Sequence, residues 1–149
     1  VQRIAAKDSQ SSFVGSDFSY EDVSGRNIDA DAHKLLREEE LGGKPCYVVE
    51  SLPKGSASYK RKVSWIDKAT FLPLRDEYYD VQNQLFREFS AEEIKDIDGV
   101  PTAIKRSMKN VKSGHQTVVE FSDVKYRLAL KPGDFSERAL RNPPGDWIK

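Results

Sequence analysis

Polar and apolar residues alternate along most of the stretch 60–126. The clearest example is the run 100–112, where Ile104 and Met108 fall on one side of the alternation and Lys105 on the other. Because successive side chains of a β-strand point to opposite faces, an alternation of period two predicts a strand with one apolar and one polar face. The stretch is therefore expected to form a succession of two-faced strands.

Short polar turns separate these runs. In chain order, the expected strands span residues 32–41, 46–52, 60–67, 72–79, 84–97, 100–112 and 115–126. The pairs Gly42-Gly43 and Asp98-Gly99 are residue combinations that favour tight hairpin turns. Strands that follow one another through such short connections predict an up-and-down antiparallel sheet.

The segments outside the predicted sheet also carry large apolar residues. Residues 7–25 are rich in Ser, Gly and Asp but contain Phe13, Phe18 and Tyr20, so this segment is expected to lie on the sheet as irregular or short helical structure. A short helix is expected around 135–140. Val1 to Ala6 is expected to be the end of a strand whose beginning is cut off.

Composition narrows the class of protein. The 149 residues are expected to form a single domain, 1–149, with one core. Lys and Arg number 24 and Asp and Glu also 24, so the charge favours neither nucleic acid nor an anionic membrane surface as a partner. The longest apolar runs fall well short of the length that a membrane-spanning helix needs.

Candidate catalytic and metal-binding residues are few and isolated. His33 and His115 have no Cys or second His at a ligand spacing, and both are expected to be solvated. Cys46 is expected to act as a small buried hydrophobe. Phosphate loops, dinucleotide fingerprints and serine-nucleophile turns are absent from the sequence. The sequence thus predicts a protein that is not an enzyme and that uses no metal or other cofactor.

The apolar face of the sheet is the remaining candidate for function. The side chains expected to form this face come from five strands: Val63, Trp65, Leu74, Tyr78, Phe89, Ile104, Met108, Val119 and Phe121. On composition alone, an ordinary core covered by helices is favoured. The functional interpretation is a concave lining for a lipid or acyl chain.

Several motifs, in the same order along the chain, resemble one known family. They are Phe13-Val14-Gly15-Ser16-Asp17-Phe18-Ser19-Tyr20-Glu21-Asp22, Val63-Ser64-Trp65-Ile66-Asp67 followed by Leu72-Pro73-Leu74, Met108-Lys109-Asn110-Val111 with Gly114-His115 and Thr117, Glu120-Phe121-Ser122-Asp123, and Phe135-Ser136-Glu137-Arg138-Ala139-Leu140. Together they resemble the outer-membrane lipoprotein-sorting protein family, relatives of the LolA and LolB lipoprotein carriers.

The resemblance implies a mainly β fold, a curved antiparallel meander that forms an incomplete, half-closed β-barrel with short helices over its concave face. Phe13, Phe18 and Tyr20 would then belong to a lid. The implied function is lipid or lipoprotein acyl-chain binding in the periplasm of a Gram-negative bacterium, with envelope transport proteins as further partners. A sterol-like or other lipid cargo stays open, as does a purely structural or protein-interaction domain; a hydrolase is a more distant alternative.

Members of that family carry a further N-terminal portion before the stretch that resembles Val1 to Ala6. The chain is therefore expected to correspond to the C-terminal part of a longer domain. An unpaired sheet edge would follow, and unpaired backbone groups are a template for pairing with another chain. Self-association through this open edge is accordingly expected.

Overall fold

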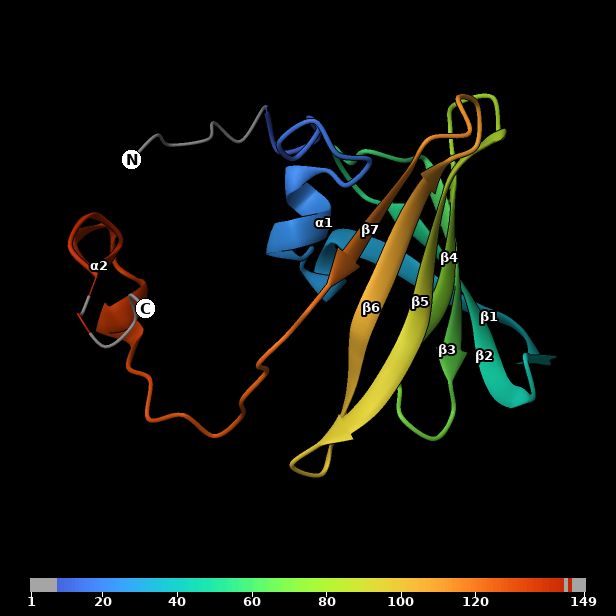
Figure 1. The fold of residues 1–149 in the computed structure, drawn as a ribbon. Coiled ribbons are helices and arrows are strands. Elements are labelled where there is room, and N and C mark those ends of the chain that lie inside the picture. Colours follow the sequence, from blue (N-terminus) through green and yellow to red (C-terminus); the bar gives the residue numbers. More distant parts are fainter. Residues whose placement is uncertain (1–7, 144, 146–149) are drawn as a thin grey trace.

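A seven-stranded antiparallel sheet dominates the computed structural model, which describes residues 8–143 and 145 (Figure 1). Each strand pairs with its neighbours in sequence, in the order β1 to β7, and the sheet stays open. The strands are β1 (Asp31–Leu41), β2 (Lys44–Pro53), β3 (Arg61–Asp67), β4 (Pro73–Tyr79), β5 (Leu85–Ile97), β6 (Val100–Asn110) and β7 (Gln116–Glu120). The predicted mainly β meander is confirmed.

Tight turns set the order of the strands. Gly42 and Gly43, between β1 and β2, have φ angles of 57° and 80°. Asp98 and Gly99, between β5 and β6, have φ angles of 54° and 78°. Two consecutive positive φ values match the backbone of hairpin turns that follow the twist of the flanking strands. The structure ends β7 at Glu120, earlier than the predicted strand 115–126.

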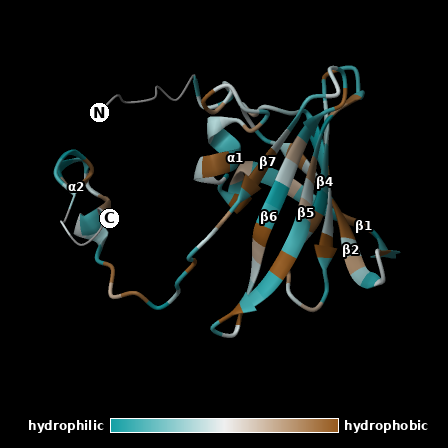
Figure 2. Cartoon of the chain, viewed as in Figure 1, coloured by the Kyte–Doolittle hydropathy of each residue, from teal (hydrophilic) through white to brown (hydrophobic). Residues whose placement is uncertain are grey.

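Cross-strand pairing defines two faces of the sheet. Trp65 of β3 pairs with Val48 of β2 and Arg75 of β4, so these three residues share a face. We call it the outer face. Tyr78 of β4 pairs with Arg87 of β5 on the opposite side, which we call the inner face. Figure 2 shows the corresponding bands of hydrophobic and hydrophilic residues along β5 and β6.

Each face has its own hydrophobic cluster. The outer cluster consists of Cys46, Val48, Val63, Trp65 and Leu74. The inner cluster consists of Phe18, Tyr59, Tyr78 and Met108, with Phe13, Ala57, Phe86, Phe89 and Val119 packed against it. The sheet therefore buries apolar side chains on both sides over part of its area.

The N-terminal segment covers the inner face, as predicted. It contains helix α1 (Tyr20–Ser24), followed by the short helix η2 (Ile28–Ala30). A capping box begins α1: the Ser19 hydroxyl accepts a hydrogen bond from Asp22 N, and the Asp22 carboxylate accepts one from Ser19 N at 2.7 Å. Reciprocal caps of this kind satisfy backbone donors that a helix start leaves unpaired. Figure 1 places α1 on the open side of the curved sheet.

The C-terminal segment does not cover the inner face, contrary to the expectation for this helix. Helices η3 (Pro132–Phe135) and α2 (Glu137–Arg141) form where a helix was predicted, but they pack against each other and lie away from the sheet (Figure 1). Residues 121–131 lack regular structure and lead from β7 away from the sheet (Figure 1). Phe135 of η3 and Leu140 of α2 stay exposed.

Two points concern the ends of the sheet. Among the described residues, β1 is an edge strand, and it carries the acidic run Glu38-Glu39-Glu40. The predicted strand end Val1 to Ala6 lies outside the described residues.

Candidate functional site: an apolar cleft under the N-terminal segment

A cleft of about 510 Å³ opens between the N-terminal segment and the inner face of β6 and β7. Its lining side chains are Phe13, Val14, Ser16, Phe18, Asp22, Val23, Arg106, Thr117, Val119 and Phe121. Residues 8–26 form one wall, and we call them the lid. Most of the lining is apolar, and several members are aromatic, as in sites that bind small apolar ligands.

Apolar side chains remain exposed at the mouth of this cleft. Val14 is 81% exposed and Phe121 is 43% exposed. Val14 also has a φ of 51°, a conformation that β-branched residues rarely adopt because of steric strain. Its neighbour Phe13 is held by a T-shaped contact with Tyr20, with ring centroids 5.3 Å apart. The lid thus keeps an apolar residue strained and solvent-facing at the edge of an apolar cavity.

Polar contacts fasten the lid to the start of β7. Asp17 N donates to Thr117 Oγ1 at 3.0 Å, and that hydroxyl donates to Asp17 Oδ2 at 2.8 Å. His115 Nδ1 lies 2.6 Å from the same carboxylate oxygen. The lid is therefore tied down at one point beside the cleft, by side chains that are partly accessible to solvent.

A buried ion pair fastens the lid at a second point. Arg87 of β5 is only 8% exposed, and its Nη1 donates to Asp22 Oδ2 at 2.9 Å. The same guanidinium donates to Ser58 Oγ at 3.1 Å and lies over the Tyr78 ring, 4.8 Å from its centroid. Asp22 in turn caps α1, so one carboxylate connects the helix start to the sheet.

A third set of contacts holds the chain that follows α1. Arg26 Nε donates to Asp31 Oδ1 at 2.8 Å, and the Tyr59 hydroxyl donates to Asp31 Oδ2. Burial works against the charge of Asp31, but the hydrogen bonds from Tyr59 and Arg26 outweigh it and lower the pKa of Asp31 below its ordinary value. Burial and the Asp31 charge raise the pKa of Tyr59, which stays a neutral donor.

A smaller and more polar cavity of about 250 Å³ adjoins the cleft beneath α1. Asp76 of β4 lines it and is 6% exposed. Asp76 Oδ1 is buried and has no hydrogen-bond partner among the described residues. Burial raises the pKa of this carboxyl, although Lys62 and hydrogen bonds from Ser64 and Tyr78 act in the opposite direction. An unpartnered buried acceptor is rare in folded proteins.

Replacing Asp76 with Asn is expected to stabilise the protein more as pH rises. The folded protein holds the Asp76 proton more tightly than the unfolded chain, whose pKa lies near 3.8. The stability that the protonated carboxyl provides is complete below that value and is lost as pH rises through the higher folded pKa. Asp76→Asn removes this loss, so its melting temperature should exceed the wild-type value by a margin that grows as pH rises above about 4.

Asp31→Asn is the matched control, because the pKa of Asp31 is shifted in the opposite direction. Its ionised form contributes stability above the unfolded pKa, and that contribution is lost as pH falls. Asp31→Asn should therefore be less stable than wild type near neutral pH, with a deficit that shrinks in acid. Thermal melts across the pH range measure both variants. A constant offset for Asp76→Asn would contradict the assignment of a raised pKa.

Six of the nine predicted lining residues lie together on the inner face. Val119 and Phe121 line the cleft, and Tyr78, Phe89 and Met108 line the smaller cavity. The sixth, Ile104, follows the β6 alternation with Met108 and is buried, but lines neither cavity. Of the predicted lid residues, Phe13 and Phe18 pack in the inner cluster, and Tyr20 contacts Phe13.

The expectation that all nine residues share one face is wrong for Val63, Trp65 and Leu74, which belong to the outer cluster. A bulge explains why the Leu74 side chain lies on the outer face. Trp65 pairs with Arg75 and Ile66 with Pro73, so Leu74 is an extra residue and turns toward the side of Trp65. Trp65 is covered by charged neighbours of the outer face: its Nε1 donates to Glu39 Oε1, and the Arg75 guanidinium lies over its ring.

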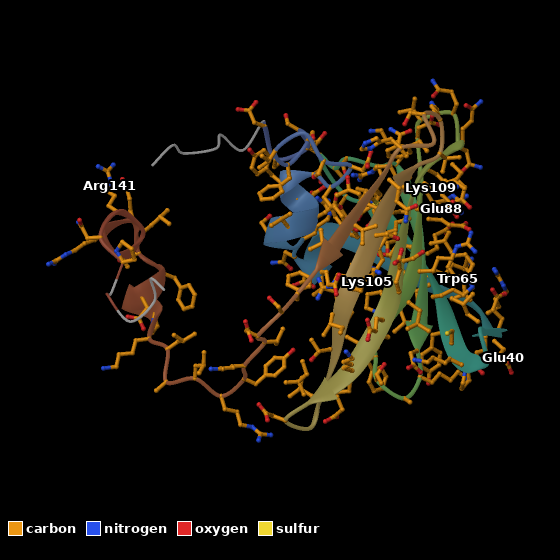
Figure 3. All side chains as sticks on the ribbon, viewed as in Figure 1. Glu40, Trp65, Glu88, Lys105, Lys109 and Arg141 are labelled. Atoms are coloured by element: carbon orange, nitrogen blue, oxygen red, sulfur yellow. The ribbon has the colours of Figure 1, made fainter. Side chains whose placement is uncertain are left out.

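The outer face is otherwise strongly charged. Glu88, Lys105 and Lys109, labelled in Figure 3, alternate on β5 and β6 with the inner-face residues. Glu88 accepts a hydrogen bond from Arg75 at 2.7 Å. The charged character of this face makes the inner face the better candidate for binding an apolar ligand.

Sequence reasoning missed the charged residues of the site, of which Arg87 and Asp22 hold the lid. Arg87 and Arg106 occupy inner-face positions in otherwise apolar stretches of β5 and β6. A charged residue at an apolar position of an alternating strand is the signal that marks such sites. Asp22 and Asp76 were likewise not identified as site residues.

The isolated candidates for chemistry have structural partners. His33 and His115 are exposed as expected, but His33 Nδ1 lies 2.9 Å from Ser51 Oγ and His115 contacts Asp17. Cys46 is fully buried in the outer cluster, as predicted, and burial raises the pKa of its thiol. The described residues contain no group of His, Cys, Asp and Glu arranged to hold a metal ion. No described helix is long and apolar enough to cross a membrane.

Comparison with known proteins places this geometry in a family. A family model with the description "Uncharacterized protein" matches residues 1–142. The sequence has no match among curated proteins. Solved structures do match, and the identity to the first two is about 30% over nearly the whole chain.

Three solved structures share the fold. A DUF1329 family protein from Desulfovibrio piger is 32% identical, with a TM-score of 0.84 over 93% of this chain. A putative outer membrane lipoprotein-sorting protein domain from Vibrio parahaemolyticus is 30% identical, with a TM-score of 0.87 over 94% of this chain. A LolA superfamily protein from Nitrosomonas europaea is 26% identical, with a TM-score of 0.71 over 87% of this chain. The chain spans 59–60% of each of these proteins.

Proposed function

Because the chain belongs to the family matched over residues 1–142 and is LolA-like in fold, we propose that its inner-face cleft binds a lipid or lipoprotein acyl chain. The observation that carries this proposal is the apolar cleft under the lid, whose volume of about 510 Å³ lies within the range typical of ligand sites. Each buried CH₂ group contributes about 0.8 kcal/mol, so a long acyl chain supplies ample binding energy.

The exposed apolar residues at the mouth support the same interpretation. The exposure of Val14 and Phe121 to water is unfavourable as long as no apolar partner covers these side chains. An acyl chain entering the cleft would cover both. The strained φ of Val14 fits a residue kept for contact with a ligand rather than for stability.

The proposed function is that of a non-enzymatic carrier in the periplasm. The similarity to the Vibrio protein, a putative outer membrane lipoprotein-sorting domain, supports an envelope location, and transport proteins of the envelope are the corresponding partners. The polar groups of the site support binding rather than catalysis, because most of them are engaged in fastening the lid.

Native mass spectrometry of the protein purified from a Gram-negative host, followed by organic extraction, tests the proposal. We expect an adduct of acyl-lipid mass that extraction removes. A protein that carries no lipid and also fails to bind an added sixteen-carbon fatty acid would contradict the proposal. That result would favour the alternative, a structural or protein-interaction domain, for which the exposed apolar residues Leu128, Leu130, Phe135 and Leu140 are the supporting observation.

Self-association through a sheet edge is a further proposal. In the described residues, β1 and β7 each have a neighbour on one side only. The acidic residues of β1 oppose edge pairing, whereas β7 carries the exposed Val118. Sedimentation at about ten micromolar should show dimers, and Val118→Lys should reduce them. A clean monomer at that concentration would contradict edge pairing.

A further inference from the structure

The cleft and the smaller cavity beneath α1 lie next to each other. Phe18, Asp22 and Arg106 line both. The cleft is mostly apolar, while the smaller cavity adds Lys62, Asp76 and other charged residues. The two cavities together thus have an apolar end and a polar end, which is the pattern of a site for an amphiphile.

Most charged groups around the smaller cavity already have partners. Arg26 Nη1 donates to Glu21 at 2.5 Å, and Asp22 pairs with Arg87 at 2.9 Å. These contacts hold the lid and leave little capacity for a ligand.

Three groups retain that capacity. Arg106 Nε donates to Ala103 O at 3.1 Å, and the guanidinium lies 4.9 Å from the Phe121 ring centroid. The terminal nitrogens of Arg106 and the Lys62 ammonium have no hydrogen bond to a described residue, and Asp76 Oδ1 has none either. The uncommitted groups are therefore two cations and one buried acceptor.

We propose that the cavity beneath α1 is a headgroup subsite for an amphiphile that carries a negatively charged oxygen and a hydroxyl group. Arg106 and Lys62 bind the anionic oxygen, and Asp76 Oδ1 accepts a hydrogen bond from the hydroxyl. The inference rests on the proposed function, because it requires the alkyl chain to occupy the adjoining cleft. An alkylated phosphoglycerol has the required groups in the required order.

The position of Arg106 explains how one ligand spans both cavities. Its guanidinium lies over Phe121, whose ring lines the apolar cleft, while the side chain also lines the polar cavity. An arginine combines stacking on an aromatic ring with hydrogen bonds from the rim of its guanidinium. Arg106 thus lies where the alkyl chain of the ligand would join its headgroup.

Three twelve-carbon probes separate the two headgroup contacts. Dodecylphosphoglycerol carries phosphate and hydroxyls, dodecylphosphocholine carries phosphate without a hydroxyl, and dodecylglycerol carries hydroxyls without phosphate. Calorimetric titration is performed below the micelle concentration of each probe. We expect the wild-type protein to bind dodecylphosphoglycerol at least about tenfold more tightly than either of the others.

Variants assign the contacts to residues. Asp76→Leu removes the acceptor. It should weaken the binding of dodecylphosphoglycerol by about tenfold and leave the affinity for dodecylphosphocholine unchanged. Arg106→Gln should weaken the binding of both phosphate probes and leave the affinity for dodecylglycerol unchanged. Lys105→Gln, the adjacent residue on the outer face, is the control and should change none of them. Circular dichroism checks that each variant keeps its sheet.

The outcomes distinguish this inference from the proposed function. Equal affinity for the three probes, unchanged in Asp76→Leu and Arg106→Gln, would overturn the headgroup subsite and leave acyl-chain binding intact; Asp76 would then be satisfied by water alone. If none of the probes binds, neither the cleft nor the subsite takes an alkyl amphiphile, and both proposals fail.

Discussion

Arg87→Met should lower the free energy of unfolding by about 3–5 kcal/mol, because it leaves the Asp22 carboxylate buried without its partner. Arg87 donates to Asp22 at 2.9 Å and to Ser58 at 3.1 Å, and it is almost completely enclosed. The lid also loses its connection to β5. Urea unfolding followed by circular dichroism measures the loss.

Arg75→Met is the control on the outer face. Arg75 pairs with Glu77 and Glu88, but its side chain is 37% exposed, so water screens these pairs and a much smaller loss is expected. Asp22→Asn combined with Arg87→Met should cost less than the sum of the single changes, since the two charges form one pair. Strict additivity would show that the ion pair does not hold the lid.

Val119→Glu should abolish the binding of a fluorescent fatty acid. Val119 lines the cleft and is half-buried. A carboxylate at this position has to lose its hydration when the acyl chain of the fatty acid enters the cleft. Titration of the fluorescent probe measures the affinity, and the circular dichroism spectrum has to match that of the wild type.

Val118→Glu is the matched control, one residue away on the same strand. Val118 is 49% exposed and points to the outer face, away from the cleft. The same substitution there should leave the affinity unchanged. Equal loss in both variants would mean that a charge on β7 acts through the fold, and undiminished binding in folded Val119→Glu would exclude the cleft.

The architecture of the sheet could be predicted from local chemistry alone. Alternation identified the strands, and turn pairs such as Asp98-Gly99 identified the hairpins, because both signals depend only on neighbouring residues. The capping box that begins α1 is also local, because Ser19 and Asp22 are three positions apart. These features need no knowledge of how distant strands pair.

The local sequence could not predict which face of each strand turns inward. Val63 and Trp65 alternate correctly, yet the pairing of β3 with β2 and β4 directs them to the outer cluster. A single extra residue at Leu74 then moves that side chain to the outer face as well, since a bulge shifts the alternation by one position. Bulges leave no clear signal in one sequence.

The ion pairs of the lid were also beyond sequence reasoning. Asp22 and Arg87 are 65 positions apart, and Asp17 and Thr117 are 100 positions apart. Nothing in their local sequence specifies that they meet. The sequence offered only the unusual placement of Arg87 and Arg106 in apolar stretches, which indicates a buried charge but not its partner.

Photo-crosslinking with a sixteen-carbon fatty acid that carries a terminal diazirine tests the central claim most directly. Peptide mapping by mass spectrometry then locates the label. If the chain occupies the cleft under the lid, the label should fall on lid residues such as Phe13 and on β7 residues such as Val119 and Phe121. A label concentrated on the outer cluster around Trp65, or spread evenly over the protein, would contradict the assignment of the inner-face cleft as the binding site.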